Sequence, residues 1–186
     1  MYIAANDSNF KDAPDSRVMA VGLIGRHKYS PSFTLDARLG VAFAHQSASS
    51  IAQAQNTQAP AGTITLGYTD NTFHANLNGN VGYSGLTGIG QIARLWTVGL
   101  DIGDQYTQRW SWSLAGIYQK SFTVFQESET SANGVVGSAG IHYAPWEWGS
   151  FDLTGSATRS WSTGLSPIVD YSAVLGVTVG KTYTAF

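Results

Sequence analysis

Two stretches of this chain alternate between apolar and small polar residues almost without interruption. One runs from Phe33 to Phe43 and the other from Phe73 to Tyr83, so each begins and ends its apolar face with an aromatic residue. A period of two is typical of a β-strand that has one apolar and one polar face. Such a stretch spans ~33 Å along the strand, or ~25 Å of height at a tilt of about 40°. A membrane-spanning strand has an apolar band of this height, with an aromatic residue at each interface.

The composition favours polar faces that are enclosed rather than open to bulk water. Only 12% of the 186 residues are charged, and 21 are glycine. The polar faces consist mainly of Asn, Ser, Thr, Gly and Ala, whereas the open face of a soluble sheet usually carries many Lys and Glu residues. Small side chains with few charges suit a confined interior.

The same composition argues against several classes of function. A formal net charge of −2 with no basic stripe excludes a typical nucleic-acid partner. The lack of cysteine excludes disulfides and cysteine-based metal sites. No apolar run reaches the ~18 residues of a membrane-spanning helix. No signal peptide is visible, so we expect the mature form of an exported protein.

Turn residues divide the chain into nine clear strand candidates, and the connections between them alternate in length. The short connections are 27–31, 69–71, 104–108 and 144–149, and the longer ones are 45–62, 85–94, 120–133 and 162–167. Short periplasmic turns that alternate with longer outer loops are typical of outer-membrane barrels. The expected strands are 17–26, 32–44, 63–68, 72–84, 95–103, 109–119, 134–143, 150–161 and 169–186.

The number of strands depends on what precedes residue 17. The strand at 17–26 runs down into a short turn, so another strand should rise before it, and residues 2–5 fit that place. The prediction is therefore an all-β fold, a transmembrane antiparallel up-and-down β-barrel of about ten strands that forms one domain over residues 1–186. Two alternatives stay open. The barrel has eight strands if 63–68 is irregular, or the chain is the C-terminal part of a larger barrel.

Aromatic residues gather at the two ends of the expected strands rather than at their centres. Side chains in the core of a soluble sandwich would instead concentrate at strand centres. The pattern predicts two aromatic girdles, one at each membrane interface. The residues expected in these girdles are Phe33, Phe43, Phe73, Tyr83, Trp96, Trp110, Tyr143, Phe151, Trp161 and Tyr171.

The last expected strand starts near Tyr171 and ends on Phe186. In this it resembles the bacterial outer-membrane β-barrel protein superfamily, whose terminal aromatic residue is read by the barrel-assembly machinery. The resemblance implies that Phe186 is an assembly signal and that this machinery is a partner during insertion. The chain departs from the family pattern at Thr184, where an apolar residue is usual. A bulge near Gly180 would correct the register, and without it Lys181 would have to reach the membrane rim.

The polar face of the expected strands carries most of the titratable residues and a ladder of three asparagines. One interpretation is a constriction that selects small polar solutes, and the other is a hydrogen-bonded network that fills a narrow barrel. The residues expected to line the lumen are Asp36, Arg38, His74, Asn76, Asn78, Asn80, Asp101, Arg109, His142 and Asp152.

Enzymatic and metal chemistry have weak support in the sequence. His74 and His142 lie near the periplasmic ends of inward faces, with Ser111 and Asp152 at a similar height. No serine-centred motif and no His-x-x-x-His spacing accompanies them, so no catalytic residue, metal site or cofactor is expected.

The sequence also indicates contacts with the membrane. Arg94 and Arg159 each lie two residues from an aromatic residue of the outer girdle, where they pair with lipopolysaccharide phosphates or simply remain solvated. We expect an integral protein of the bacterial outer membrane, either monomeric or of undefined oligomeric state. The first functional hypothesis is a narrow polar channel for small polar solutes. The alternatives are a structural or surface-interaction barrel with a filled lumen, or part of a larger export conduit.

Overall fold

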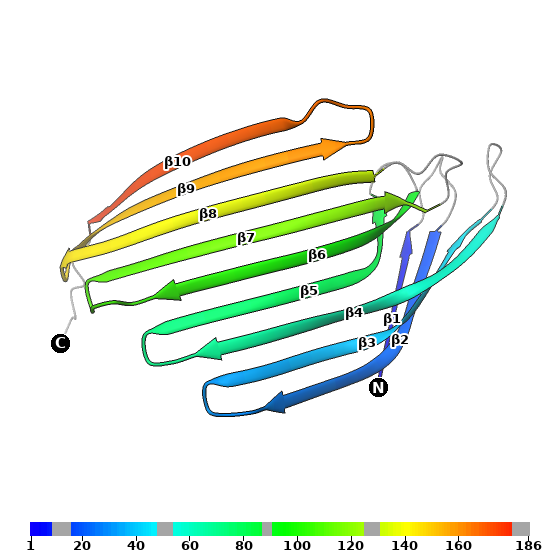
Figure 1. Ribbon diagram of the computed structural model, residues 1–186, viewed down its shortest axis with the longest axis horizontal. Coiled ribbons are helices and arrows are strands. Elements are labelled where there is room, and N and C mark those ends of the chain that lie inside the picture. Colours follow the sequence, from blue (N-terminus) through cyan, green and yellow to red (C-terminus); the bar gives the residue numbers. More distant parts are fainter. Residues whose placement is uncertain (9–15, 48–53, 87–90, 125–130, 180–186) are drawn as a thin grey trace, which may run out of the picture.

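The computed structural model describes residues 1–8, 16–47, 54–86, 91–124 and 131–179. These residues form one ten-stranded antiparallel sheet in which every strand pairs with its neighbours in chain order (Figure 1). None of its elements is a helix long and apolar enough to cross a membrane. The strands are β1 (Tyr2–Ser8), β2 (Ser16–Lys28), β3 (Phe33–Gln46), β4 (Gln55–Thr69), β5 (Phe73–Leu86), β6 (Gln91–Asp104), β7 (Trp110–Thr123), β8 (Ser131–Trp146), β9 (Gly149–Ser162) and β10 (Ile168–Val179).

The prediction of ten antiparallel up-and-down strands is confirmed, but the sheet is not closed. Within the described part of the chain, β1 pairs only with β2 and β10 pairs only with β9. The sheet curls strongly without its two edges meeting (Figure 1). Each edge strand therefore carries unpaired backbone N–H and C=O groups along its free side.

The strands are longer than the alternation predicted, and the prediction of a long loop at 45–62 is wrong. β3 continues to Gln46, and β4 already begins at Gln55. This first half of β4 contains no large apolar residue, so it lacks the alternation that reveals a strand. It pairs with β3 but not with β5, whose ladder with β4 ends at Gly62 and Val81. Pro60, which has no N–H to donate, lies in this half-paired segment.

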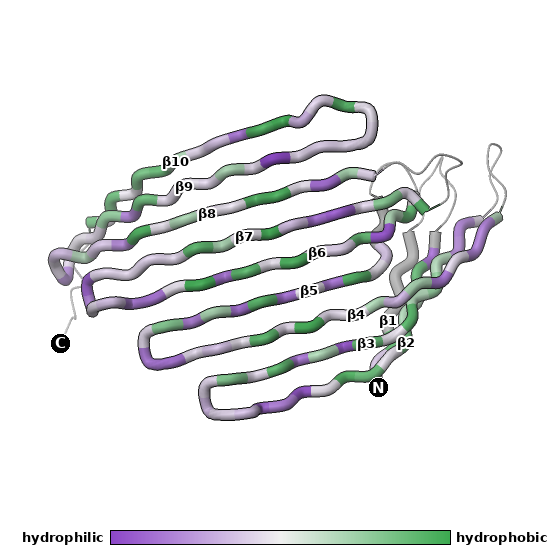
Figure 2. Tube along the Cα trace, in the orientation of Figure 1, coloured by the Kyte–Doolittle hydropathy of each residue, from purple (hydrophilic) through white to green (hydrophobic). Residues whose placement is uncertain are grey.

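Buried and exposed side chains are distributed in the opposite way from those of a soluble protein. In β3, Ala42 and Ala44 are 2% exposed, whereas their neighbour Phe43 is 47% exposed. Side chains alternate between faces, so in this part of the sheet the small and polar face is sheltered and the apolar face is open. We call the face of Ala42 and Ala44 the sheltered face on all strands, although Asn78 and Asn80 on it are exposed. The alternation is visible along the strands in Figure 2. Apart from Ile92, the buried apolar residues in the described chain are all alanines.

Three glycines allow β2, β3 and β4 to approach closely where the sheet curls. A Cβ atom on Gly40 would lie 2.1 Å from the carbonyl oxygen of Val21, and one on Gly62 would lie 2.2 Å from the carbonyl oxygen of Arg38. A Cβ on Gly22 would lie 2.4 Å from the Leu39 oxygen. No side chain fits at such distances, so these glycines permit the tight curvature of this part of the sheet.

Candidate functional site

The sheltered face carries the asparagine ladder of β5. Asn76, Asn78 and Asn80 are paired in register with Asp101, Gly99 and Thr97 of β6. Cross-strand partners share a face, so the ladder and Asp101 lie on one polar wall. The three amides and the carboxylate offer both donors and acceptors to whatever lies in front of this wall.

Glycines on neighbouring strands make room for the larger polar side chains of this wall. A Cβ on Gly99 would lie 2.7 Å from Oδ1 of Asn78, and one on Gly103 would lie 2.4 Å from Cε1 of His74. These two side chains therefore lie sideways over glycine backbone instead of projecting straight out from the sheet. The sequence alone did not reveal this pairing, because it depends on the register between β5 and β6.

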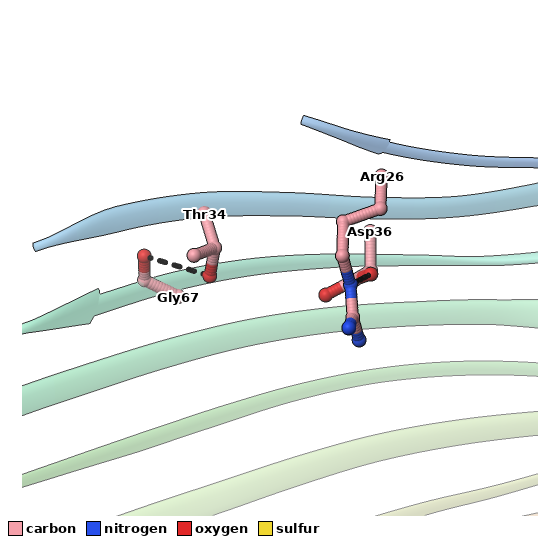
Figure 3. A network of polar contacts seen from close by, with 4 residues as sticks. All are labelled: Arg26, Thr34, Asp36 and Gly67. Atoms are coloured by element: carbon pink, nitrogen blue, oxygen red, sulfur yellow. Dashed lines mark hydrogen bonds and ion pairs between the residues drawn. The ribbon is translucent and has the colours of Figure 1, made fainter. Parts of the chain in front are cut away.

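Among the described residues, three ion pairs lie on the same face, each between neighbouring strands. Arg26 of β2 contacts Asp36 of β3, and both side chains extend from the same side of the sheet (Figure 3). His74 Nε2 is 3.2 Å from Asp101 Oδ1. These side chains are largely open to solvent, so the pairs contribute little to stability, typically ~0–1 kcal/mol each.

The third pair joins His142 and Asp152. His142 Nδ1 is 2.6 Å from Asp152 Oδ1, and the hydroxyl of Ser150 donates to Asp152 Oδ2 at 3.4 Å. His142 and Asp152 are register partners on β8 and β9. The charged partners of both histidines come from the next strand, which the sequence analysis did not specify.

Two residues of the expected lumen have a different setting. Arg38 shares the sheltered face with Asp36 and has Ile24 and Thr63 as register partners, neither of which carries a charge. Arg109 precedes β7 in a turn, where its N–H is 3.2 Å from the Thr107 hydroxyl oxygen. Arg109 therefore lies at the end of the sheet rather than on a strand face.

A cavity of about 380 Å³ lies at the short-turn end of the sheltered face, with His74, His142, Asp152 and Ser111 in its lining. Ser111, His142 and Asp152 form one row across β7, β8 and β9. Their order is that of a nucleophile, a base and an orienting carboxylate. However, the strand N–H groups nearby are used in the ladders, so the row has no free pair of donors for an oxyanion. No cluster of three metal-ligating residues occurs among the described residues.

Aromatic side chains form a belt at the short-turn end of the other, apolar face. The rings of Trp110 and Tyr143 stack with centroids 4.2 Å apart. The other ring contacts there are between Phe33 and Tyr29, between Phe73 and Tyr68, between Phe151 and Trp146, between Trp146 and Trp148, and between His27 and Tyr29. Tyr29 and Trp146 join the expected girdle residues because the short turns bring their rings alongside.

The long-connection end of the apolar face is less regular. Phe43, Trp96 and Tyr171 are exposed there, and Trp161 is half-exposed. Tyr83 differs from the others, because its hydroxyl lies 3.3 Å from the hydroxyl oxygen of Thr57, which is on the sheltered face of β4. The loss of pairing between β4 and β5 beyond Val81 frees this side chain to turn inward. Phe186, Gly180, Lys181 and Thr184 lie outside the described residues.

Three cations stack on aromatic rings near this end of the sheet. Arg94 lies 5.1 Å from the ring centroid of Trp96, and Arg159 lies 5.7 Å from that of Trp161. Lys120, which the sequence analysis did not select, lies 4.5 Å from the ring centroid of Phe122. In all three cases the cation lies two residues from an aromatic residue on the same strand, and i and i+2 share a face, so the spacing used for Arg94 and Arg159 would also have found Lys120.

No family model matches the chain, and no curated protein is significantly similar to it.

Proposed function

We propose that this chain is an integral outer-membrane protein whose sheet forms the wall of a narrow channel for small polar solutes. Its single strongest support is the reversed distribution of side chains. Leu39, Leu77 and Leu153 are between 43% and 56% exposed, whereas the alanines of the opposite face in β3 and β4 are at most 8% exposed (Ala42, Ala44, Ala59 and Ala61). Leaving so much apolar surface in water is unfavourable by ~25 cal/mol per Å². Lipid contact on that face removes the cost.

The polar wall supports a passage rather than a filled interior. His74 and Asn78 lie over glycine backbone, which keeps their atoms close to the sheet. Such a wall presents amides, carboxylates and imidazoles to water, and it suits small polar solutes without a strong preference for one charge. We infer no enzymatic activity, because the row of Ser111, His142 and Asp152 lacks an oxyanion site.

The register of the sheet supports closure by pairing of β1 with β10. The row that starts at Tyr2 passes through Gly22, Gly40 and Ala61. The ladder between β4 and β5 ends at Val81, one residue before this row reaches β5. On the far side of this gap the row continues from Gly82 through Leu95, Ser121 and Ala132 to Ser162 at the end of β9. The ladders are therefore staggered in one direction, as closing a tilted barrel requires.

The size of this stagger fits a ten-stranded barrel. If Tyr2 paired with Thr178, all of β1 would lie alongside β10 with like faces together. The offset along the strands that accumulates once around the barrel, its total stagger, would then be about 12 residues. Strands ~4.8 Å apart with a rise of ~3.3 Å per residue would then tilt by ~40°, within the usual range for such barrels. The backbone radius would be ~10 Å, and a layer of side chains ~5 Å thick would leave a lumen radius of ~5 Å.

Single-channel recording tests the transport function. Purified protein folded into planar bilayers is expected to give discrete, ohmic conductance steps, because a water-filled lumen of this radius admits hydrated ions. A closed baseline from protein that is shown to be folded and inserted would reject the channel and favour a structural or surface-interaction barrel.

Cysteine cross-linking tests the closure, and the natural chain contains no cysteine that would interfere. The double variant Ile3→Cys/Val177→Cys places both thiols on the apolar face in the proposed register. We expect an intramolecular disulfide, whereas Ile3→Cys/Ala173→Cys, displaced by four residues on β10, should remain reduced. Dimers linked through these cysteines, or no cross-link at all, would instead indicate that the edges pair with other strands, as in a larger conduit.

A further inference from the structure

The outward face near the long-connection end carries two cations on adjacent strands that have no acidic partner among the described residues. Arg94 of β6 lies in the row of Phe122 on β7, and Lys120 of β7 lies in the next row, opposite Trp96. Arg94 and Lys120 are therefore diagonal neighbours on one face, with Cβ atoms ~7–8 Å apart.

The cation–π contacts lean each cation along its own strand toward the row of the other cation. Arg94 stacks over Trp96, which is in the row of Lys120, and Lys120 stacks over Phe122, which is in the row of Arg94. Each charged group therefore lies over a ring that belongs to the row of the other cation. Like charges on adjacent strands repel one another, and an anion bound by both would relieve this repulsion.

The described residues provide no such anion. The ion pairs among them involve Arg26, His74 and His142, and none includes Arg94 or Lys120. The Nε–H group of Arg94 is shielded from solvent and has no hydrogen-bond partner. A guanidinium with an unsatisfied Nε–H that stacks on a tryptophan, with a lysine on the adjacent strand, is suited to a phosphate group attached to an apolar tail.

We propose that Arg94 and Lys120 bind the phosphate of a phosphorylated outer-leaflet lipid, with Trp96 and Phe122 packing against its apolar part. This proposal rests on the membrane location proposed above. Arg159 stacks on Trp161 of its own strand, β9, which is two strands from β7. It therefore lies ~10 Å from Lys120 along the same face and would meet a second phosphate of the same lipid surface. A bisphosphorylated lipid A is the probe with this chemistry.

The test compares binding of bisphosphorylated lipid A to three proteins folded in phosphatidylcholine nanodiscs. The double variant Arg94→Gln/Lys120→Gln is expected to bind at least ~10-fold more weakly than the natural chain, because two charge-assisted contacts are lost. The control is Lys28→Gln. Lys28 is the last residue of β2 and lies on the opposite face from Arg94, at the short-turn end of the sheet, so this variant should bind like the natural chain. Equal binding by the double variant, or no binding by the natural chain, would overturn the proposal.

Two further arms keep the causes of failure apart. Insertion into phosphatidylcholine alone is measured first, since failure there would reject the membrane location and the lipid site together, whereas normal insertion without lipid A binding would reject only the site. Inorganic phosphate at equal concentration is the second arm. We expect it to compete poorly, and competition as strong as that of the lipid would reassign the site to a free phosphate.

Discussion

Leu77 and Asn78 are adjacent on β5 but lie on opposite faces, which allows one matched pair of substitutions to test which solvent each face meets. Their register partners, Leu100 and Gly99, are likewise on opposite faces of β6. Leu77→Arg places a charge on the apolar face, and Asn78→Arg places the same charge at the same height on the polar face. The local strand propensity changes similarly in both variants.

The expected magnitude follows from the position of Leu77 along the strand. It lies four residues from Phe73 of the short-turn belt, which is ~10 Å of height at a tilt of ~40°. In an apolar band ~25 Å tall this is close to the midplane, where an arginine facing lipid costs ~2–4 kcal/mol. The folding equilibrium should therefore fall ~30-fold to ~1000-fold for Leu77→Arg. Asn78→Arg faces water and should cost less than ~1 kcal/mol.

Urea titration in phosphatidylcholine vesicles measures both values, with the six tryptophans as the fluorescence signal. A water-facing apolar surface would make Leu77→Arg no more costly than Asn78→Arg. Free energies of unfolding that agree within ~0.5 kcal/mol for the two variants would therefore refute lipid contact at Leu77 and the membrane location with it.

Three further predictions concern curvature, charge and the aromatic belt. Gly40→Ala should lower the free energy of unfolding by ~1–3 kcal/mol because its Cβ would meet the Val21 oxygen, whereas Gly134→Ala, with no atom within 4 Å of its Cβ, should be neutral in the same urea titration. Asp152→Lys replaces a negative with a positive charge on the polar wall and should shift the reversal potential in a salt gradient toward anion preference, and an unchanged potential would place Asp152 outside the conduction path. Trp110→Ala removes the ring stacked on Tyr143 and should destabilise folding in vesicles by ~1–3 kcal/mol, an effect absent if this belt does not lie at an interface.

The sequence alone determined the strands whose alternation is strong. The runs from Phe33 and from Phe73 became β3 and β5, because a large apolar residue at every second position permits only one face to be polar. It also placed most of the polar residues on one face, since this depends only on parity along a strand. The first half of β4 was missed because its residues are small and its pairing with β3 comes from the hairpin rather than from its own pattern.

The tertiary structure decided everything that depends on which residues face each other across strands. His142 was paired with Asp152, and Asn78 was placed over Gly99, by register alone. The inward turn of Tyr83 follows from the end of the ladder between β4 and β5, which no local pattern encodes. The unpaired edges of β1 and β10 have the same origin, because long-range strand pairing depends on the shape of the whole sheet.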